Sequence, residues 1–167
     1  IETAAQTLKT YGRKYLGGEL GFTLVLHTWG QSLQKHPHLH FIVTGGALVK
    51  TADGYRWQAA KHNYLFPAEE FSRDFRNVFC NGIQKLWQAG NLNTCDGNLD
   101  VAGMLRKAEA TDWEVFIQAP LYGPQKLVEY LGRYIFRIAI SNHRILDVKR
   151  GQVTFQYYDN REGNKFK

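Results

Sequence analysis

Hydrophobic residues recur along this chain at two spacings, one typical of helices and one typical of strands. Apolar side chains three and four residues apart share one face of a helix, so such a run predicts an amphipathic helix. Four segments have this spacing: residues 4–16, 67–89, 99–108 and 125–136. Gly17 after the first segment, Pro67 at the start of the second and Pro124 before the fourth are typical of helix ends.

Two of these helices carry apolar stripes that we expect to be buried. The stripe of the second helix consists of Phe71, Phe75, Val78, Phe79, Ile83 and Leu86. The stripe of the fourth helix consists of Leu127, Val128, Leu131 and Ile135. Faces of this kind usually form protein core, so we assign neither stripe to a cofactor.

Strands are predicted where apolar and polar residues alternate or where β-branched residues cluster. Residues 20–28 and 38–44 fit this description and are joined by a short loop, so they should pair antiparallel. Residues 113–119 alternate as well and should add another strand to the sheet. Asp53-Gly54 predicts a peripheral hairpin of residues 47–58, and Arg150-Gly151 predicts a final hairpin of residues 145–158. The chain should therefore have an α+β fold with a central antiparallel β-sheet.

Composition is consistent with a soluble protein of one domain. The chain has 167 residues, of which 44% are hydrophobic, enough for one core spanning residues 1–167. Its apolar runs are too short to span a membrane, and its start at Ile1 suggests a fragment of a longer protein. Cys80 and Cys95 lack the spacing of a zinc site, so a reducing cytoplasm is the simpler assumption. A net charge of +6 is compatible with a polyanionic partner.

The segment His36-Pro-His-Leu-His40 concentrates three imidazoles in five residues. On a strand, His38 and His40 leave the same face, close enough to share one metal ion or one phosphate. Leu39, on the opposite face, can then be buried.

Strand parity brings a third histidine to this face. If Leu26 points to the buried side, His27 points to the other and lies roughly opposite His38 and His40 in the antiparallel pair. Two histidines at alternate positions with a third opposite favour a metal site over isolated hydrogen-bonding residues.

Tyr130 and Tyr134 lie four residues apart on the predicted fourth helix and therefore on one side of it. Tyrosines at this spacing are usually packing residues, but beside a metal site they suggest another role. A phenolate can attack a phosphodiester polarised by a divalent metal, giving a covalent phosphotyrosine that conserves the bond energy for rejoining. Two such residues could handle two strand ends in succession.

These motifs together resemble a known family. His38-Leu39-His40 resembles the His-hydrophobic-His signature of HUH endonucleases, and Tyr130-Leu-Gly-Arg-Tyr134 resembles the Tyr-x-x-x-Tyr of their two-tyrosine members. The surrounding sequence is similar to that of transposases of the insertion-sequence ninety-one type. The similar stretches include Leu26-His-Thr-Trp-Gly and Ile138-Ala-Ile-Ser-Asn-His-Arg. The resemblance covers most of the chain.

The resemblance implies a rolling-circle transposase domain that nicks single-stranded DNA and retains the 5′ end on a tyrosine. It implies Mg²⁺ or Mn²⁺ on the histidines, helices mainly on one face of the sheet, and a cytoplasmic, nucleoid-associated bacterial protein. Members of the family are longer and have an N-terminal zinc-binding region that this chain lacks.

The third metal ligand stays open at this stage. Related relaxases use a histidine about eleven residues before the pair, the spacing of His27 here, and His36, Gln31 and Gln34 are the alternatives. An imidazole-only site would suit a transition metal better than Mg²⁺.

DNA contacts are expected from the basic residues near the tyrosines. Arg133, Arg137 and Lys126 could hold backbone phosphates, although the arginines could equally be solvated. Aromatic residues such as Trp29, Tyr55 and Trp57 could stack bases of single-stranded or hairpin DNA ends.

Two rival functions remain. One is a metal-dependent hydrolase that uses water, and the other is a DNA-binding domain without catalysis.

Overall fold

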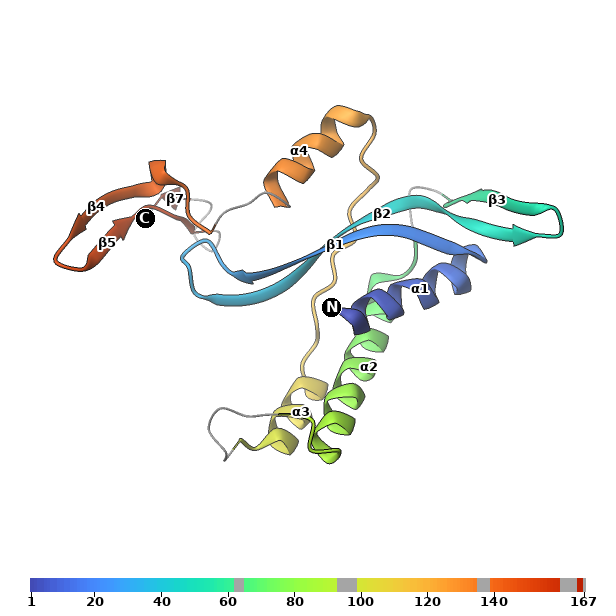
Figure 1. The fold of residues 1–167 in the computed structure, drawn as a ribbon, viewed down its shortest axis with the longest axis horizontal. Helices are drawn as coiled ribbons and strands as arrows, with labels where there is room; N and C mark the ends of the chain where they lie inside the picture. Colours follow the sequence, from blue (N-terminus) through green and yellow to red (C-terminus); the bar gives the residue numbers. More distant parts are fainter. Residues whose placement is uncertain (62–64, 93–98, 135–138, 160–164, 167) are drawn as a thin grey trace. The chain divides into compact units, whose positions relative to one another are not determined.

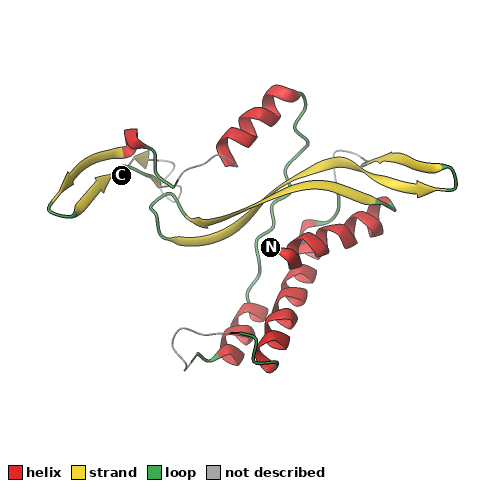
Figure 2. Ribbon diagram, viewed as in Figure 1, coloured by secondary structure: helices red, strands yellow, loops and turns green. Residues whose placement is uncertain are grey.

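A computed structural model describes residues 1–61, 65–92, 99–134, 139–159 and 165–166. The helices are α1 (Glu2–Leu16), α2 (Ala68–Gln88), α3 (Val101–Ala110), α4 (Pro124–Tyr134) and the short 3-10 helix η1 (Asn142–Arg144). The strands are β1 (Glu19–Trp29), β2 (Lys35–Thr51), β3 (Gly54–Ala59), β4 (Ile145–Lys149), β5 (Gln152–Phe155), β6 (Tyr158–Asp159) and β7 (Lys165–Phe166). Helices and strands alternate in blocks along the chain (Figures 1 and 2), which confirms the α+β class.

The main sheet has three antiparallel strands in the order β1-β2-β3. β2 is 17 residues long and runs without a break through Gly45 and Gly46, pairing with β3 from Gly46↔Ala59 to Thr51↔Gly54. The predicted hairpin of residues 47–58 is confirmed, and its first strand is continuous with the central strand of the sheet. β4 with β5 and β6 with β7 form two further two-stranded sheets.

The described residues divide into two compact units. Unit 1 comprises Ile1–Thr23 and Ile42–Pro120, and unit 2 comprises Leu24–Phe41 and Leu121–Lys167. Strands β1 and β2 each contribute residues to both units. None of the helices in the described ranges is long and apolar enough to cross a membrane.

Unit 1 is built on the packing of α1, α2 and α3. Tyr11 of α1 is 2% exposed, and its ring makes edge contacts with Phe66 and Phe71 at centroid distances of 5.1 Å each. α1 ends at Gly17, whose φ of 69° is a left-handed conformation that glycine adopts without strain. The next residue, Gly18, lies so close to β2 that a Cβ there would be 2.4 Å from the Leu48 carbonyl oxygen. These two glycines allow the chain to leave α1 and enter the sheet.

The buried face of α2 differs from its predicted stripe. Phe71 and Cys80 are buried, and the rings of Phe75 and Phe79 each lie 5.3 Å from the ring of Trp113. Val78 and Leu86 were predicted to be buried, but they are 50% and 44% exposed. The prediction was too broad because α2 packs against α1 and α3 along a narrower face than its apolar residues cover.

Residues 113–119 do not form the predicted strand. This segment has no regular secondary structure, and Phe116 is 86% exposed. Trp113 instead donates a hydrogen bond from Nε1 to the Ala108 carbonyl, at 3.1 Å, near the end of α3. The alternation was misleading because its largest residue packs against helices rather than against a neighbouring strand.

The buried face of α4 also differs from its predicted apolar stripe. Leu127 and Val128 were predicted to be buried but are 38% and 64% exposed, whereas Leu131 is half-buried. Ile135, the last member of the predicted stripe, lies outside the described residues.

Candidate functional site

Three histidines predicted to meet on one face of the sheet do come together. His27 lies on β1, and His38 and His40 lie on β2. The ring of His27 is 4.6 Å from that of His40 and 5.3 Å from that of His38, between centroids, and the His38 and His40 rings are 4.9 Å apart. Each offers one ring nitrogen, and these nitrogens lie within 4.8 Å of one another. The antiparallel pairing of two strands thus gathers histidines that are distant in the sequence.

Burial of the cluster differs from the prediction. His27 is 5% exposed, whereas its neighbour Leu26, expected on the buried side, is 43% exposed. The Trp29 ring stacks on His27 at 6.0 Å, so the histidine side of this part of β1 is the packed one. The prediction of Leu26 was wrong because strand alternation fixes which residues share a face but not which face is covered.

A backbone contact defines the tautomer of His38. Its Nδ1 lies 2.7 Å from the His36 carbonyl oxygen, which can only accept, so Nδ1 must carry the proton. In the neutral ring this tautomer has its lone pair on Nε2, the form in which imidazole binds a metal. Metal-binding histidines typically use their other nitrogen in this way, because the second hydrogen bond fixes the orientation of the ring.

The donor set fits a divalent transition ion. Metal-to-nitrogen bonds are about 2.1 Å, so neighbouring nitrogens on one ion would be roughly 3 Å apart. The observed upper limit of 4.8 Å would require the rings to approach by small side-chain rotations. Imidazole suits zinc, copper, iron and nickel ions, whereas Mg²⁺ and Mn²⁺ are more often bound by oxygen ligands.

The alternatives for a third ligand lie differently. His36 is exposed, and its ring is 4.8 Å from that of His38 but is not part of the three-residue cluster. The Gln34 side chain contacts Ser32, and the Gln31 carbonyl accepts a hydrogen bond from Arg144. Of the two histidine candidates, His27 is the one whose ring nitrogen clusters with those of His38 and His40.

Arg144 connects the turn before the histidine strand to the C-terminal hairpin. Its Nη2 donates to the Gln31 carbonyl at 2.6 Å and its Nε to the Gln156 carbonyl at 2.7 Å. Its guanidinium also lies 5.9 Å from the centre of the Phe155 ring. No local pattern in the sequence could have indicated the two carbonyl partners of Arg144, one of which is 113 residues away.

The predicted nucleophiles lie on one helix. Tyr130 and Tyr134 both belong to α4, as expected, and Tyr130 is half-buried. α4 belongs to unit 2, which also contains His27, His38 and His40.

The predicted DNA-binding residues are only partly described. Lys126 on α4 is exposed, as a phosphate contact requires. The structure gives the backbone of Arg133 and Tyr134 as part of α4 but neither side chain, and Arg137 lies outside the described residues.

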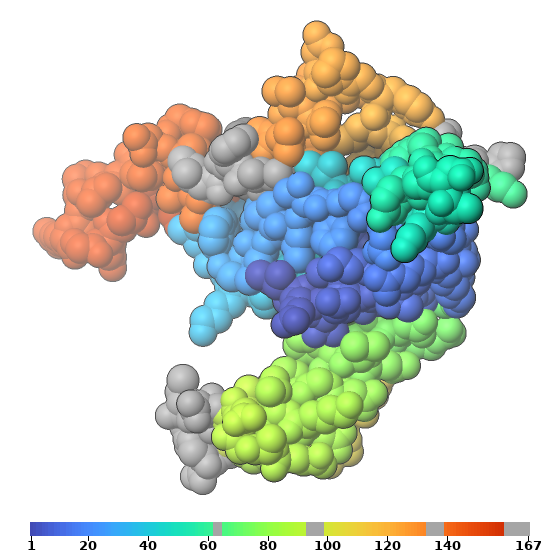
Figure 3. Space-filling view, turned by 45° about the vertical axis from the view of Figure 1, so that its right-hand side comes forward, coloured from blue at the N-terminus to red at the C-terminus, as the bar shows by residue number. Residues whose placement is uncertain are grey.

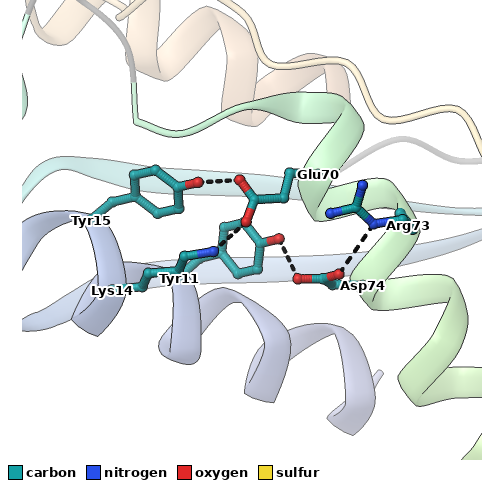
Figure 4. Close-up of polar contacts among 6 residues, drawn as sticks. All are labelled: Tyr11, Lys14, Tyr15, Glu70, Arg73 and Asp74. Carbon is teal, nitrogen blue, oxygen red and sulfur yellow. Dashed lines mark hydrogen bonds and ion pairs between the residues drawn. The ribbon is translucent and has the colours of Figure 1, made fainter.

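A second Tyr-x-x-x-Tyr occurs on α1, and its surroundings make it a poor nucleophile pair. Tyr11 donates a hydrogen bond to Asp74 Oδ2 at 2.7 Å, and Tyr15 donates to Glu70, which also pairs with Lys14 (Figure 4). Burial, followed by the hydrogen bond to Asp74 and the nearby carboxylate charges, raises the pKa of Tyr11 well above its usual range. The hydrogen bond to Glu70 raises the pKa of Tyr15. Both phenols are held in the protonated, less nucleophilic form and link α1 to α2.

Comparison with known proteins gives one family. The sequence model of a family described as "Putative transposase" matches residues 21–167. A protein named "Putative transposase y4qJ" from Sinorhizobium fredii is 40% identical over 178 residues, covering 100% of this chain and 44% of that relative. The "Transposase for insertion sequence element IS801" of Pseudomonas savastanoi pv. phaseolicola is 26% identical over 156 residues, covering 90% of this chain and 37% of that relative. The chain thus spans less than half the length of these relatives, and no solved structure matches it.

Proposed function

Because this chain belongs to the transposase family that matches residues 21–167, we propose that it carries the DNA nicking and joining chemistry of a transposase. The finer assignment is a two-tyrosine HUH endonuclease of the insertion-sequence ninety-one type, acting on single-stranded DNA during rolling-circle transposition. The observation that carries this proposal is the cluster of His27, His38 and His40 in the same compact unit as the helix bearing Tyr130 and Tyr134.

In this proposal, His27, His38 and His40 hold one divalent cation, Mn²⁺ or Mg²⁺. When bound, such an ion stabilises the negative charge that develops on a non-bridging phosphate oxygen. The strands contribute rigidity, since each histidine is part of a hydrogen-bonded sheet. The His36 carbonyl keeps the His38 ring in the tautomer that can donate its Nε2 lone pair.

A tyrosine of α4 supplies the nucleophile. The phenol loses its proton, its oxygen bonds to phosphorus, and the bond from phosphorus to the 3′ oxygen breaks. The 3′ oxygen takes up a proton and leaves as a free hydroxyl, while the 5′ phosphate remains on the tyrosine. Attack by a 3′-hydroxyl on the phosphotyrosine reverses the step and joins two strands. Tyr130 and Tyr134 can each hold one DNA end, which simple hydrolysis does not require.

A covalent-trapping experiment tests the proposal. The protein is incubated with Mn²⁺ and single-stranded oligonucleotides labelled at the 3′ end and derived from the DNA flanking its gene, then denatured. We expect label on the protein and, by mass spectrometry, a nucleotide on Tyr130 or Tyr134. Tyr130→Phe with Tyr134→Phe should abolish the adduct, because phenylalanine has no nucleophilic oxygen.

Tyr15→Phe is the matched control for this experiment. It removes a phenol from the other helical Tyr-x-x-x-Tyr and should leave adduct formation unchanged. Cleavage without any adduct would favour the hydrolase that uses water. Binding without cleavage, unaffected by the double substitution, would favour a DNA-binding domain without catalysis.

A further inference from the structure

One face of the β2–β3 hairpin carries large side chains that the rest of unit 1 leaves exposed. In the register of the two strands, Leu48 pairs with Trp57 and Lys50 pairs with Tyr55. Residues two apart on a strand share a face, so these four side chains lie together. Leu48, Tyr55 and Trp57 are 49%, 72% and 51% exposed. We call this set the hairpin platform; the hairpin stands at the surface, coloured blue-green, in Figure 3.

The opposite face of the hairpin is the one that packs. Ala47 is fully buried, and Val49 approaches Gly18 so closely that a Cβ there would be 2.9 Å from Val49 Cγ2. The exposure of Trp57 is therefore not a consequence of a loosely attached hairpin, because β2 packs closely against Gly18 on the other side.

The Trp57 ring is itself held in place. An ideal Cβ built on Gly46 would lie 2.5 Å from Trp57 Cζ2, so the indole rests directly on the bare backbone of Gly46. One side of the ring is thus supported by the strand while half of the side chain stays exposed. A fixed aromatic surface of this kind loses little conformational entropy when another flat ring stacks on it.

The spacing and charge of the platform match single-stranded nucleic acid. Tyr55 and Trp57 are two residues apart, which separates them by about 6.7 Å along the strand and gives each ring room for its own base. Lys50 brings positive charge to the platform, whereas Arg56 pairs with Val49 and lies on the opposite face. Together with Lys61 after the hairpin, these basic residues outnumber Asp53, an excess of positive charge that suits a phosphate backbone. Duplex DNA hides its base faces inside the stack, so only unpaired nucleotides can use the rings.

We propose that the hairpin platform binds single-stranded DNA by stacking unpaired bases on Trp57 and Tyr55, with Lys50 close to the backbone phosphates. The choice of DNA rests on the proposed function, while the stacking rests on the geometry of the hairpin. A second copy of the chain pairing along β3, an outer strand of the sheet, is the competing occupant, and the experiment separates the two.

Fluorescence anisotropy with a labelled oligothymidylate, in the presence of a chelator, tests the proposal without using the histidine cluster. Loss of one stacked base should weaken binding about 5- to 150-fold in Trp57→Ala, and Trp57→Phe should restore much of the affinity. Phe116→Ala, which removes an aromatic side chain that is 86% exposed outside the platform, is the matched control and should bind as the wild type does.

An abasic oligonucleotide of equal length separates stacking from a general loss of structure. Trp57→Ala should bind this ligand as well as the wild type does, because there is no base to stack. Equal weakening for both ligands, or no weakening for either, would overturn the proposal. A decrease in oligomer mass in Trp57→Ala without DNA would assign the face to self-association and would overturn it as well.

The result can be told apart from the test of the catalytic proposal. Suppose that Trp57→Ala loses affinity only for the oligonucleotide with bases, while no tyrosine adduct forms in any variant. This result would support base stacking on the hairpin platform and contradict the proposed nicking chemistry. Suppose instead that adducts form on Tyr130 or Tyr134, but Trp57→Ala changes the affinity for both oligonucleotides equally. This result would support the nicking chemistry and contradict base stacking on the hairpin platform.

Discussion

The His36 carbonyl determines which nitrogen of His38 can bind a metal, and this contact comes from the backbone rather than from a side chain. A substitution of the His36 side chain therefore preserves the tautomer of His38. Loss of the His38 ring, in contrast, removes one of the three clustered donors. The two histidines are close in sequence but differ in what their removal should do.

His38→Ala should weaken Mn²⁺ binding by more than the roughly 10- to 100-fold typical of losing an outer-sphere partner of a metal ligand. Titration calorimetry or the electron paramagnetic resonance signal of free Mn²⁺ would measure this. His36→Ala and His143→Ala, each of which removes an exposed imidazole, should bind Mn²⁺ as the wild type does. Greater loss in His36→Ala than in His27→Gln would show that His36 is the third ligand.

Tyr11 should make the protein less stable at high pH. Its folded pKa is raised, mainly by burial, so the folded state keeps the phenol proton after the unfolded chain begins to lose it at about pH 10. The stabilisation is complete below that pH and is lost as the pH rises toward the folded pKa, at up to about 1.4 kcal/mol per pH unit.

Urea unfolding across this alkaline range would measure the contribution of Tyr11. Tyr11→Phe should be less stable than the wild type near neutral pH, because Asp74 loses its hydrogen bond, but its stability should fall less steeply above about pH 10. Tyr55→Phe, which removes a hydroxyl from a side chain that is 72% exposed, is the matched control for the loss of a phenol. An unchanged slope in Tyr11→Phe would contradict the assignment.

At the scale of elements, helices were easier to predict than the sheet. The segments at α1 to α4 were confirmed because their spacing and end signals are local. The extent of the sheet was not, since β2 continues through two glycines and residues 113–119 join no strand. Strand pairing depends on partners elsewhere in the chain, so alternation alone cannot separate an exposed extended segment from a strand. The histidine cluster was nevertheless predictable, because the parity of two adjacent strands defined it.

Arg144 is the element-scale contact that the sequence did not indicate. Arg144→Ala removes two hydrogen bonds from a charged donor and should cost about 2–4 kcal/mol of stability. Because one of them holds the turn before β2, Mn²⁺ affinity should also fall. Arg144→Lys should recover only part of both losses, since an ammonium lacks the planar fork that reaches two carbonyls.

Hydrogen exchange at the amides of residues 30–34, together with Mn²⁺ titration, would check this role. Lys149→Ala is the matched control, because it removes an 80% exposed basic side chain from β4, the strand that follows Arg144. If Arg144→Ala changes exchange and metal affinity no more than Lys149→Ala does, Arg144 is not a positioning residue for the cluster.

At the scale of the whole molecule, the prediction of a single catalytic domain over residues 1–167 stays a prediction. The two compact units share strands β1 and β2, so the ribbon that carries the histidines is covalently part of both. Such sharing could not be inferred from the sequence, because no change in composition marks the points where the chain passes between units. Local sequence patterns are enough to predict helices and strands. How these elements group into compact units depends on packing between segments that are distant in the sequence.

Along the sequence, successive segments belong to unit 1, unit 2, unit 1 and again unit 2. During synthesis on the ribosome, Leu24–Phe41, which carries the clustered histidines, is therefore made early. Residues 42–120 must be made before the rest of its unit exists. Neither unit can be produced as one uninterrupted piece of polypeptide. A chain that ended before residue 121 would therefore carry His27, His38 and His40 without α4 and the C-terminal strands that complete their unit.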